Sequence, residues 1–129
     1  MIEIQPASRV RAAVAAPPSK SYTNRAYIVA ALADGEVRLE NPLFSDDTRT
    51  MRKALLQFGV PVVEEEGATV VQGQGGRLQL PGEEIFVGNA GTTMRFLTTF
   101  AALAPGVTRL TGDDRMQARP IEELLMCLR

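Results

Sequence analysis

The stretch AALADGEVRL at residues 30–39 recurs as AALAPGVTRL at residues 101–110. In both copies an Ala-Ala-Leu-Ala run is followed by a glycine, by Arg-Leu and by an acidic pair, Asp46-Asp47 or Asp113-Asp114. A polar segment ending in arginine precedes each copy, KSYTNR at residues 20–25 and NAGTTMR at residues 89–95. Chance similarity between two Ala-rich helices is the alternative. The same order of features in both copies favours a repeated supersecondary unit.

Each copy is predicted to fold as a loop, a helix, a strand and a second helix. In the first copy the first helix has Ser21 or Thr23 as its cap and ends near Gly35. Its buried face is predicted to comprise Ala26, Val29, Ala30 and Ala33. The second helix is capped by Ser45, Asp46 or Asp47. Its apolar residues, at the spacing of an amphipathic helix, are Met51, Ala54, Leu55 and Phe58.

Short strands complete the first copy, and the second copy repeats the beginning of the pattern. Strands are predicted at residues 36–40, 60–64, 68–72 and 78–80, with a hairpin turn at residues 73–76. In the second copy we predict a strand at residues 84–87, a helix at residues 92–104 and a strand at residues 107–110. Pro120 fits the first turn of a last helix. Its apolar face is predicted to be Ile121, Leu124, Leu125 and Leu128.

The predicted fold class is therefore α/β, built from a repeated unit that resembles βαβαββ. The two units span about residues 18–82 and 83–129, and the second is expected to be incomplete. The last helix reaches Arg129 without a C-cap residue, so we expect the chain to stop inside the architecture.

Composition excludes several kinds of site and keeps small anionic ligands among the possible ones. The 129 residues carry a formal net charge of -1, which gives no global field for nucleic acid or membrane. There is no histidine, which removes the usual zinc sites and histidine-activated nucleophiles. Cys127 is alone, so an internal disulfide is impossible. Only Lys20 and Lys53 are lysines among the 14 basic residues, and arginine offers a planar fork suited to phosphate and carboxylate.

Three loop-to-helix stretches carry candidate anion-binding residues. The first, residues 17–25, brings Lys20 and Arg25 to the start of a helix, where unpaired N–H groups favour an anion. The second, residues 88–95, is a glycine-rich turn after an apolar strand. The third, residues 112–120, contains Arg115 and Arg119. Each stretch also has a purely structural interpretation. The first could be a capped helix with solvated cations, the second a tight turn, and the third a loop whose arginines pair with neighbouring aspartates. The pair Asp46-Asp47 most simply caps its helix and pairs with Arg49 or Arg52.

Together these stretches resemble the 5-enolpyruvylshikimate-3-phosphate synthase family over nearly the whole chain. The segment at residues 19–25 looks like its shikimate 3-phosphate motif, and residues 45–48 look like a helix cap of the family. Residues 88–95 look like its phosphoenolpyruvate and glyphosate loop, and residues 115–121 like a further phosphoenolpyruvate segment. This chain has Pro18 where the family usually has glycine, and Phe96 where many members have proline.

The resemblance implies a fold, a reaction and site residues. The implied fold is an inside-out α/β barrel of two domains, with residues 1–17 as an N-terminal strand segment packing on the second domain and residues 18–129 in the first. The implied reaction transfers the enolpyruvyl group of phosphoenolpyruvate to the 5-hydroxyl of shikimate 3-phosphate and releases phosphate. Lys20, Ser21 and Arg25 would bind shikimate 3-phosphate. Phosphoenolpyruvate would be bound by Lys20, Asn89, Gly91 and Arg119, with Lys20 also catalytic.

The resemblance further implies no metal and no organic cofactor, no nucleic-acid or membrane partner, a monomeric full-length enzyme and a cytoplasmic location. Because the family's catalytic carboxylates lie beyond Arg129, this chain alone is expected to be inactive. Two alternatives remain. One is the sister transferase that uses UDP-N-acetylglucosamine, although its reactive cysteine has no counterpart in residues 112–120. The other is a truncated, non-catalytic anion-binding module.

Overall fold

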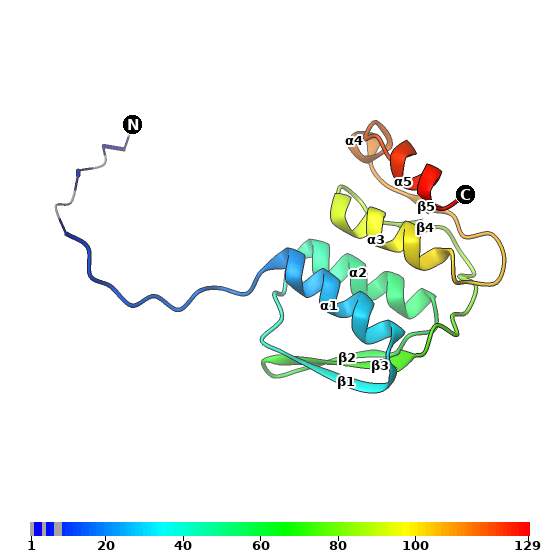
Figure 1. Cartoon of the computed structure of the whole chain (residues 1–129), viewed down its shortest axis with the longest axis horizontal. Helices are drawn as coiled ribbons and strands as arrows, with labels where there is room; N and C mark the ends of the chain where they lie inside the picture. Colours follow the sequence, from blue (N-terminus) through cyan, green and yellow to red (C-terminus); the bar gives the residue numbers. More distant parts are fainter. Residues whose placement is uncertain (1, 4, 7–8) are drawn as a thin grey trace.

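The computed structural model describes residues 2–3, 5–6 and 9–129. Residues 9–19 form no helix or strand and run away from the body of the molecule as an extended segment (Figure 1). The first unit then consists of α1 (Lys20–Leu32), β1 (Asp34–Glu40), α2 (Asp46–Gln57), β2 (Val62–Glu65) and β3 (Ala68–Gln74). The second consists of β4 (Ile85–Phe86), α3 (Gly91–Ala101), β5 (Leu110–Thr111), α4 (Asp114–Gln117) and α5 (Glu122–Cys127).

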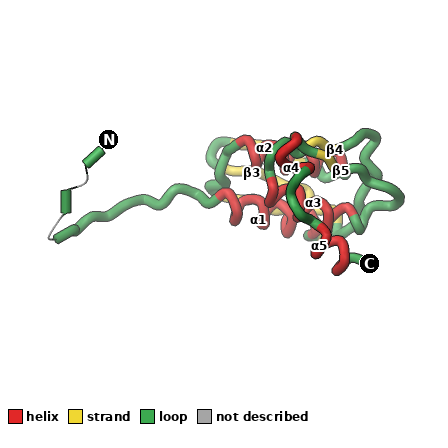
Figure 2. The backbone as a smooth tube through the Cα atoms, turned by 90° about the horizontal axis from the view of Figure 1, so that it is seen from above, coloured by secondary structure: helices red, strands yellow, loops and turns green. Residues whose placement is uncertain are grey.

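The elements are stacked in layers. The first unit forms an antiparallel sheet of order β1-β3-β2, with Asp34 opposite Gln74 at one end and Glu40 opposite Ala68 at the other. Helices α1 and α2 lie over one face of this sheet, and α3 lies over them (Figure 1). Strands β4 and β5 form a parallel pair joined through α3. The short helices α4 and α5 follow at the top of Figure 1, the side from which Figure 2 is viewed.

One hydrophobic core joins the two units. The side chains of Phe58 in the first unit and Phe100 in the second meet edge to face, with ring centroids 5.2 Å apart. This is the geometry that aromatic pairs prefer, because the positive ring edge meets the negative ring face. Other fully buried members come from both halves of the chain: Tyr27, Met51, Leu55, Val71, Ile85 and Leu97. Helices α1, α2 and α3 therefore share one core, and this packing fixes the positions of their N-termini relative to one another.

The order of the main predicted elements is confirmed, but the predicted buried face of α1 is right only in part: Ala30 is buried, whereas Val29 is exposed. Ser19, and neither Ser21 nor Thr23, caps α1 by accepting from the N–H of Tyr22. Val29 was predicted to be buried, yet it is 68% exposed. The reason is that α1 packs against β3, α2 and α3 together. The buried side of α1 therefore consists of Thr23, Asn24, Tyr27, Ala30 and Ala31.

Four further features of the structure differ from the prediction. Residues 78–80 form no strand; Leu78 is buried, and the N–H of Gln79 donates to the carbonyl of Phe58 at the end of α2 (2.9 Å). The turn in residues 73–76 therefore joins no hairpin, and the hairpin turn is instead Glu66-Gly67 between β2 and β3. Helix α4 was not predicted, because its single turn is too short to show a period. The last strand is shorter than predicted and is shifted to Leu110–Thr111.

The start of α2 is fixed by a capping box, which gives a first testable prediction. The Ser45 hydroxyl accepts from the N–H of Thr48, and the Thr48 hydroxyl accepts from the N–H of Ser45 at 2.9 Å. Replacing Ser45→Ala should lower the free energy of unfolding by about 1 kcal/mol, because a helix-end N–H loses its acceptor. Urea denaturation would measure this loss. Ser21→Ala, within α1, is the control and should change stability by less than about 0.5 kcal/mol. Equal effects of the two changes would contradict the capping argument.

Candidate functional site

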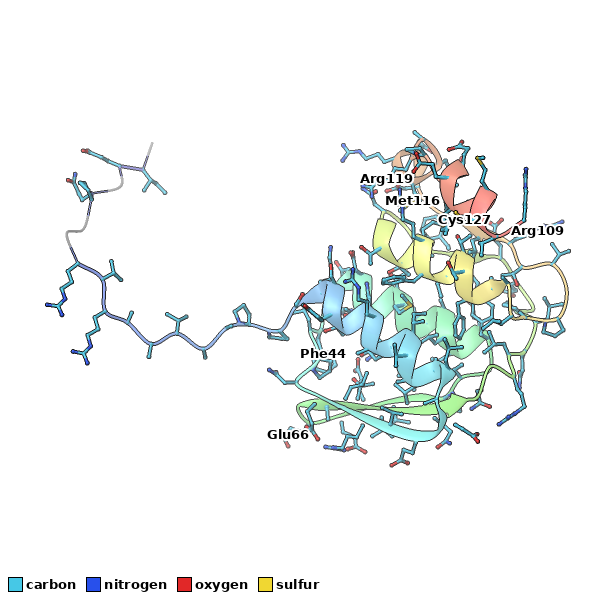
Figure 3. All side chains as sticks on the ribbon, in the orientation of Figure 1. Phe44, Glu66, Arg109, Met116, Arg119 and Cys127 are labelled. Atoms are coloured by element: carbon cyan, nitrogen blue, oxygen red, sulfur yellow. The ribbon has the colours of Figure 1, made fainter. Side chains whose placement is uncertain are left out.

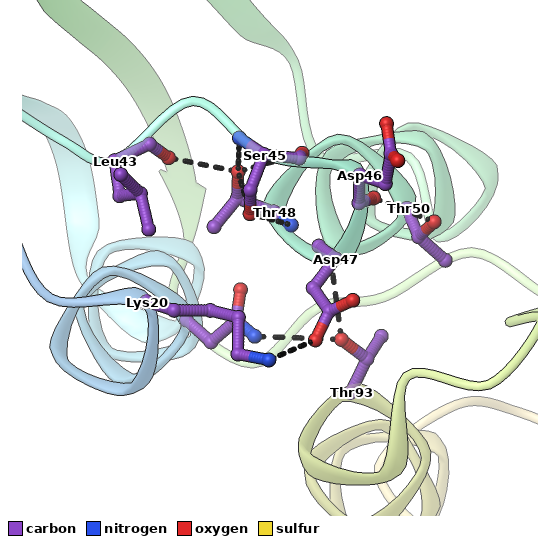
Figure 4. Close-up of polar contacts among 9 residues, drawn as sticks. Lys20, Leu43, Ser45, Asp46, Asp47, Thr48, Thr50 and Thr93 are labelled. Atoms are coloured by element: carbon purple, nitrogen blue, oxygen red, sulfur yellow. Dashed lines mark hydrogen bonds and ion pairs between the residues drawn. The ribbon is translucent and has the colours of Figure 1, made fainter. Parts of the chain in front are cut away.

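The first turns of α1, α2 and α3 meet at one end of the helical layer. Lys20 in α1 forms an ion pair with Asp47 in α2, with 2.7 Å between Nζ and Oδ2 (Figure 4). The Thr93 hydroxyl of α3 donates to the backbone carbonyl of Asp47 (3.4 Å) and accepts from the amide of Asn24 in α1 (3.4 Å). Asn24 and Thr93 are fully buried. Because one polar chain connects all three helices, their N-termini are held in a fixed arrangement.

These three helix starts and the chain after α4 enclose a cavity of about 480 Å³. Four cationic side chains and a single carboxylate line it, so the cavity carries an excess of positive charge. An apolar ring and small polar groups complete its wall. The lining residues are Lys20, Arg25, Asp47, Asn89, Gly91, Thr92, Arg95, Phe96 and Arg119. A cavity of this size and charge suits a small ligand with more than one anionic group.

Helix α3 differs from α1 and α2 at its N-terminus. Ser19 and Ser45 cap their helices with side-chain oxygens, whereas Ala90 supplies no side-chain cap to α3. The turn before it is made by Gly88, whose φ of 56° favours glycine. The backbone N–H groups at the start of α3 therefore lack a side-chain acceptor where the helix dipole is positive. Such an end favours a bound anion.

Two of the arginines are held by neighbouring groups. The Arg25 guanidinium lies 5.5 Å from the centre of the Phe96 ring and donates to the carbonyl of Ser21 (3.0 Å). Arg95 donates to the carbonyls of Gly91 (3.3 Å) and Pro120 (3.0 Å). Arg95 thereby ties the first turn of α3 to the chain that follows Arg119. Cationic groups held in this way lose less conformational freedom when an anion binds.

Arg119 follows the short helix α4 and lies against the start of α3 (Figure 3). Asp113 caps α4, accepting from the N–H of Met116 at 2.8 Å, and its own N–H donates to the carbonyl of Gly88 (3.1 Å). These bonds join the loop before α4 to the loop before α3. A Cβ atom at Gly91 would overlap the Arg119 guanidinium. The Arg119 guanidinium can therefore occupy this position only because residue 91 has no side chain.

The structure brings together five of the six residues predicted from the sequence. The residues that line the cavity are Lys20, Arg25, Asn89, Gly91 and Arg119. Ser21 is half-buried and is not part of the lining, so its role stays a prediction without a place in this cavity. Arg95 ends the glycine-rich segment at residues 88–95, but the sequence did not lead us to predict it as a site residue. Its position four residues after Gly91, one helical turn away, is the sequence signal that could have found it.

The simple interpretation of the acidic pair in α2 is half right. Asp46 does pair with Arg49, at 3.2 Å. Asp47 instead reaches across to Lys20 in α1 and thereby enters the cavity. No sequence signal indicated this contact, because the two residues lie on different helices. Asp113 caps α4, and the structure gives no ion pair between it and Arg115 or Arg119 in the described part of the chain.

Among residues 2–3, 5–6 and 9–129, no three or more His, Cys, Asp or Glu side chains gather in a way that could hold a metal ion. None of the helices described by the structure has the length and apolar character needed to cross a membrane.

Comparison with known proteins assigns the family. The model of the family described as EPSP synthase (3-phosphoshikimate 1-carboxyvinyltransferase) matches residues 4–129. A 3-phosphoshikimate 1-carboxyvinyltransferase of Methanothermobacter thermautotrophicus is 43% identical over 128 residues, which cover 99% of this chain and 30% of that protein. One from Halobacterium salinarum is 49% identical over 121 residues, covering 94% of this chain and 28% of that protein. The chain thus spans about 30% of the length of these curated relatives.

A solved structure supports the same assignment at the level of the fold. EPSP synthase from Acinetobacter baumannii superposes with a TM-score of 0.81 and 28% identity, covering 88% of this chain and 26% of that one. The expected fold class is confirmed: the fold is α/β and of the inside-out α/β barrel type found in EPSP synthases. With the sequence match over residues 4–129, this likeness shows that the chain belongs to the EPSP synthase family.

Proposed function

We propose that this chain supplies a substrate-binding part of an enzyme that transfers the enolpyruvyl group of phosphoenolpyruvate to the 5-hydroxyl of shikimate 3-phosphate. The observation that carries the proposal is the convergence of Lys20, Arg25, Arg95 and Arg119 on one cavity at three helix starts. Both substrates bear a phosphate and a carboxylate. Two such molecules repel each other, so cationic groups must gather them before they can react.

The proposed roles follow the positions of the side chains around the cavity. Arg25 binds shikimate 3-phosphate on the α1 side together with Lys20. Ser21 lies outside the cavity lining, and its proposed role in binding the same ligand rests on the family resemblance alone. Arg119 binds phosphoenolpyruvate on the α3 side, together with Asn89 and the open helix start at Gly91. Lys20 lies at the first turn of α1 and reaches the start of α2, so it can contact anionic groups of both substrates.

The proposed reaction needs charge stabilisation at two points. The 5-hydroxyl oxygen loses its proton and bonds to C2 of phosphoenolpyruvate while C3 gains a proton, which gives a tetrahedral intermediate. Loss of phosphate from C2 and of a proton from C3 then restores the double bond. Lys20 stabilises the departing phosphate by its charge. The groups that move protons at C3 are proposed to lie outside these 129 residues, so the isolated chain is expected to bind ligands without turnover.

The remaining proposals concern the whole protein. We propose a monomeric cytoplasmic enzyme without nucleic-acid or membrane partners. Within these 129 residues, the net charge of -1 offers no global field for nucleic acid. Residues 1–17 are proposed to pair as a strand with a second domain, although residues 1, 4, 7 and 8 lie outside the described part of the chain. The described residues from 9 to 17 support this in being extended and exposed.

Titration calorimetry of the 129-residue chain tests the proposed ligands. We expect binding of phosphoenolpyruvate and of shikimate 3-phosphate, each weakened at least about tenfold by Lys20→Met, because one charge-assisted contact is lost. Lys53→Met is the matched control, since Lys53 is exposed on α2 and is not part of the cavity lining. Equal affinities of the two variants would contradict the assignment of Lys20. A folded chain that binds neither compound would favour a non-catalytic module, and preference for UDP-N-acetylglucosamine would favour the sister transferase.

A further inference from the structure

Asp47 is the one carboxylate among the residues that line the cavity. It lies within a site that otherwise presents cationic and neutral groups. A negative charge at this place weakens the attraction of the cavity for anions, so its presence calls for a separate explanation. The ion pair of Asp47 with Lys20 points to such an explanation (Figure 4).

The backbone of Asp47 is anchored by its neighbours, which places its short side chain at the cavity. The capping box at Ser45 fixes the first turn of α2, and the Asp47 carbonyl accepts from the buried Thr93 hydroxyl. The Asp47 side chain is 27% exposed, and that of Lys20 is 48% exposed. The short, anchored aspartate therefore determines where the long, flexible lysine rests.

The neighbouring Asp46 shows what an ordinary helix-start aspartate does. Its side chain is 98% exposed and pairs with Arg49 one turn along the same helix. Both aspartates stabilise the positive end of α2 to a similar degree. Only the Asp47 pair crosses from one helix to another and reaches the cavity. A comparison of the two residues therefore separates a role at the helix end from a role in the cavity.

We propose that Asp47 is a positioning and specificity-determining residue that holds Lys20 at the cavity wall until a ligand displaces it. In the unliganded chain the Asp47 carboxylate takes the place of a ligand anion on the Lys20 ammonium. A simple anion such as inorganic phosphate must compete with this carboxylate and is also repelled by it. A ligand with two anionic groups can engage Arg25 or Arg119 as well, and so competes better. The preference for ligands with two anionic groups rests on the function proposed above. The restraint of Lys20 by Asp47 does not depend on that function.

The restraint can be measured on Lys20 itself. Because the chain has only two lysines, Lys20 and Lys53, side-chain NMR of selectively labelled lysine gives two signals to assign. Asp47→Asn should move the Lys20 signal toward that of exposed Lys53 and sharpen it as the side chain becomes mobile. Asp46→Asn, with the same change of charge in the same helix turn, should leave the Lys20 signal in place. Asp47→Glu, which keeps the charge, should restore it in part.

The competition can be measured with inorganic phosphate. Asp47→Asn should tighten phosphate binding about threefold to tenfold, and Asp46→Asn by less than twofold. In a Lys20→Met background the gain from Asp47→Asn should fall to the smaller part that comes from direct repulsion. Asp47→Ser is a second variant without the charge, in case the asparagine disturbs folding.

The outcomes separate the two proposals. An unchanged Lys20 signal in Asp47→Asn, or phosphate affinity that does not rise, overturns the role of Asp47. The same gain with and without Lys20 also overturns it, because Asp47 would then act on the anion directly. If phosphate moves neither lysine signal in any variant, the proposed anion-binding function fails together with the competition, while the effect of Asp47→Asn on the Lys20 signal still decides the restraint.

Discussion

Replacing Gly73→Ala should destabilise the chain by about 3 kcal/mol, the largest loss of stability expected from a single added methyl group. Gly73 lies in β3 where the end of α1 crosses the sheet. A Cβ atom there would overlap the backbone carbonyls of Ala30 and Ala33. The Ala33 carbonyl already accepts from the N–H of Gly75 at 2.8 Å, so it cannot withdraw without breaking that bond. Because the overlap is with backbone, no side-chain rotation relieves it.

Urea denaturation followed by circular dichroism would measure this loss. Gly82→Ala is the matched control, since a Cβ at Gly82 meets nothing within 4 Å. It should change stability by less than about 0.5 kcal/mol. A Gly73→Ala protein as stable as the control would mean that α1 and β3 do not approach as closely as described.

The second large effect is expected from Gly91→Ala, on ligand affinity and not on stability. Its Cβ would overlap the end of the Arg119 side chain, which is flexible and can move away. The fold should therefore tolerate the change, while the guanidinium leaves its place beside the uncapped start of α3. We expect affinity for phosphoenolpyruvate to fall about tenfold or more, since a charge-assisted contact is worth about 1.5–3 kcal/mol.

A double-mutant cycle makes this prediction specific. In an Arg119→Ala background, Gly91→Ala should have little further effect on phosphoenolpyruvate affinity, because the displaced group is already gone. Calorimetry with Gly82→Ala as the control would measure all four proteins. Additive losses would show that Gly91 acts by another route, such as the approach of ligand to its own backbone.

The sequence contained strong signals for the anion-binding stretches. Helix starts with unpaired backbone N–H groups singled out Lys20, Arg25 and the turn at residues 88–95, and the third loop-to-helix stretch offered Arg115 and Arg119. The family resemblance then selected Asn89, Gly91 and Arg119 among these candidates. These are local properties, carried by a few consecutive residues. Asp47 could not be selected in this way. Its acidic pair fits an ordinary helix cap, and its partner Lys20 lies in a different helix.

Local patterns also explain which parts of the fold could be predicted. The spacing of Met51, Ala54, Leu55 and Phe58 predicted the buried side of α2, because one strong apolar stripe leaves no choice of face. In α1, alanines and a valine lie on several sides. Packing against β3, α2 and α3 then decided that Tyr27 is buried and Val29 exposed. Residues 78–80 have strand-like composition, but they join neither of the two sheets, and the N–H of Gln79 bonds instead to the carbonyl of Phe58.

The amino-acid sequence thus determined the order of the main helices and strands and which helix starts bear cationic groups. These features depend on capping, periodicity and residue type within one or two helical turns. Only the tertiary structure decided that Lys20 rests on Asp47, that Arg119 fits against Gly91, and that Ser21 stays outside the cavity. Contacts of this kind depend on the relative placement of separate elements, and that placement is set by the shared core.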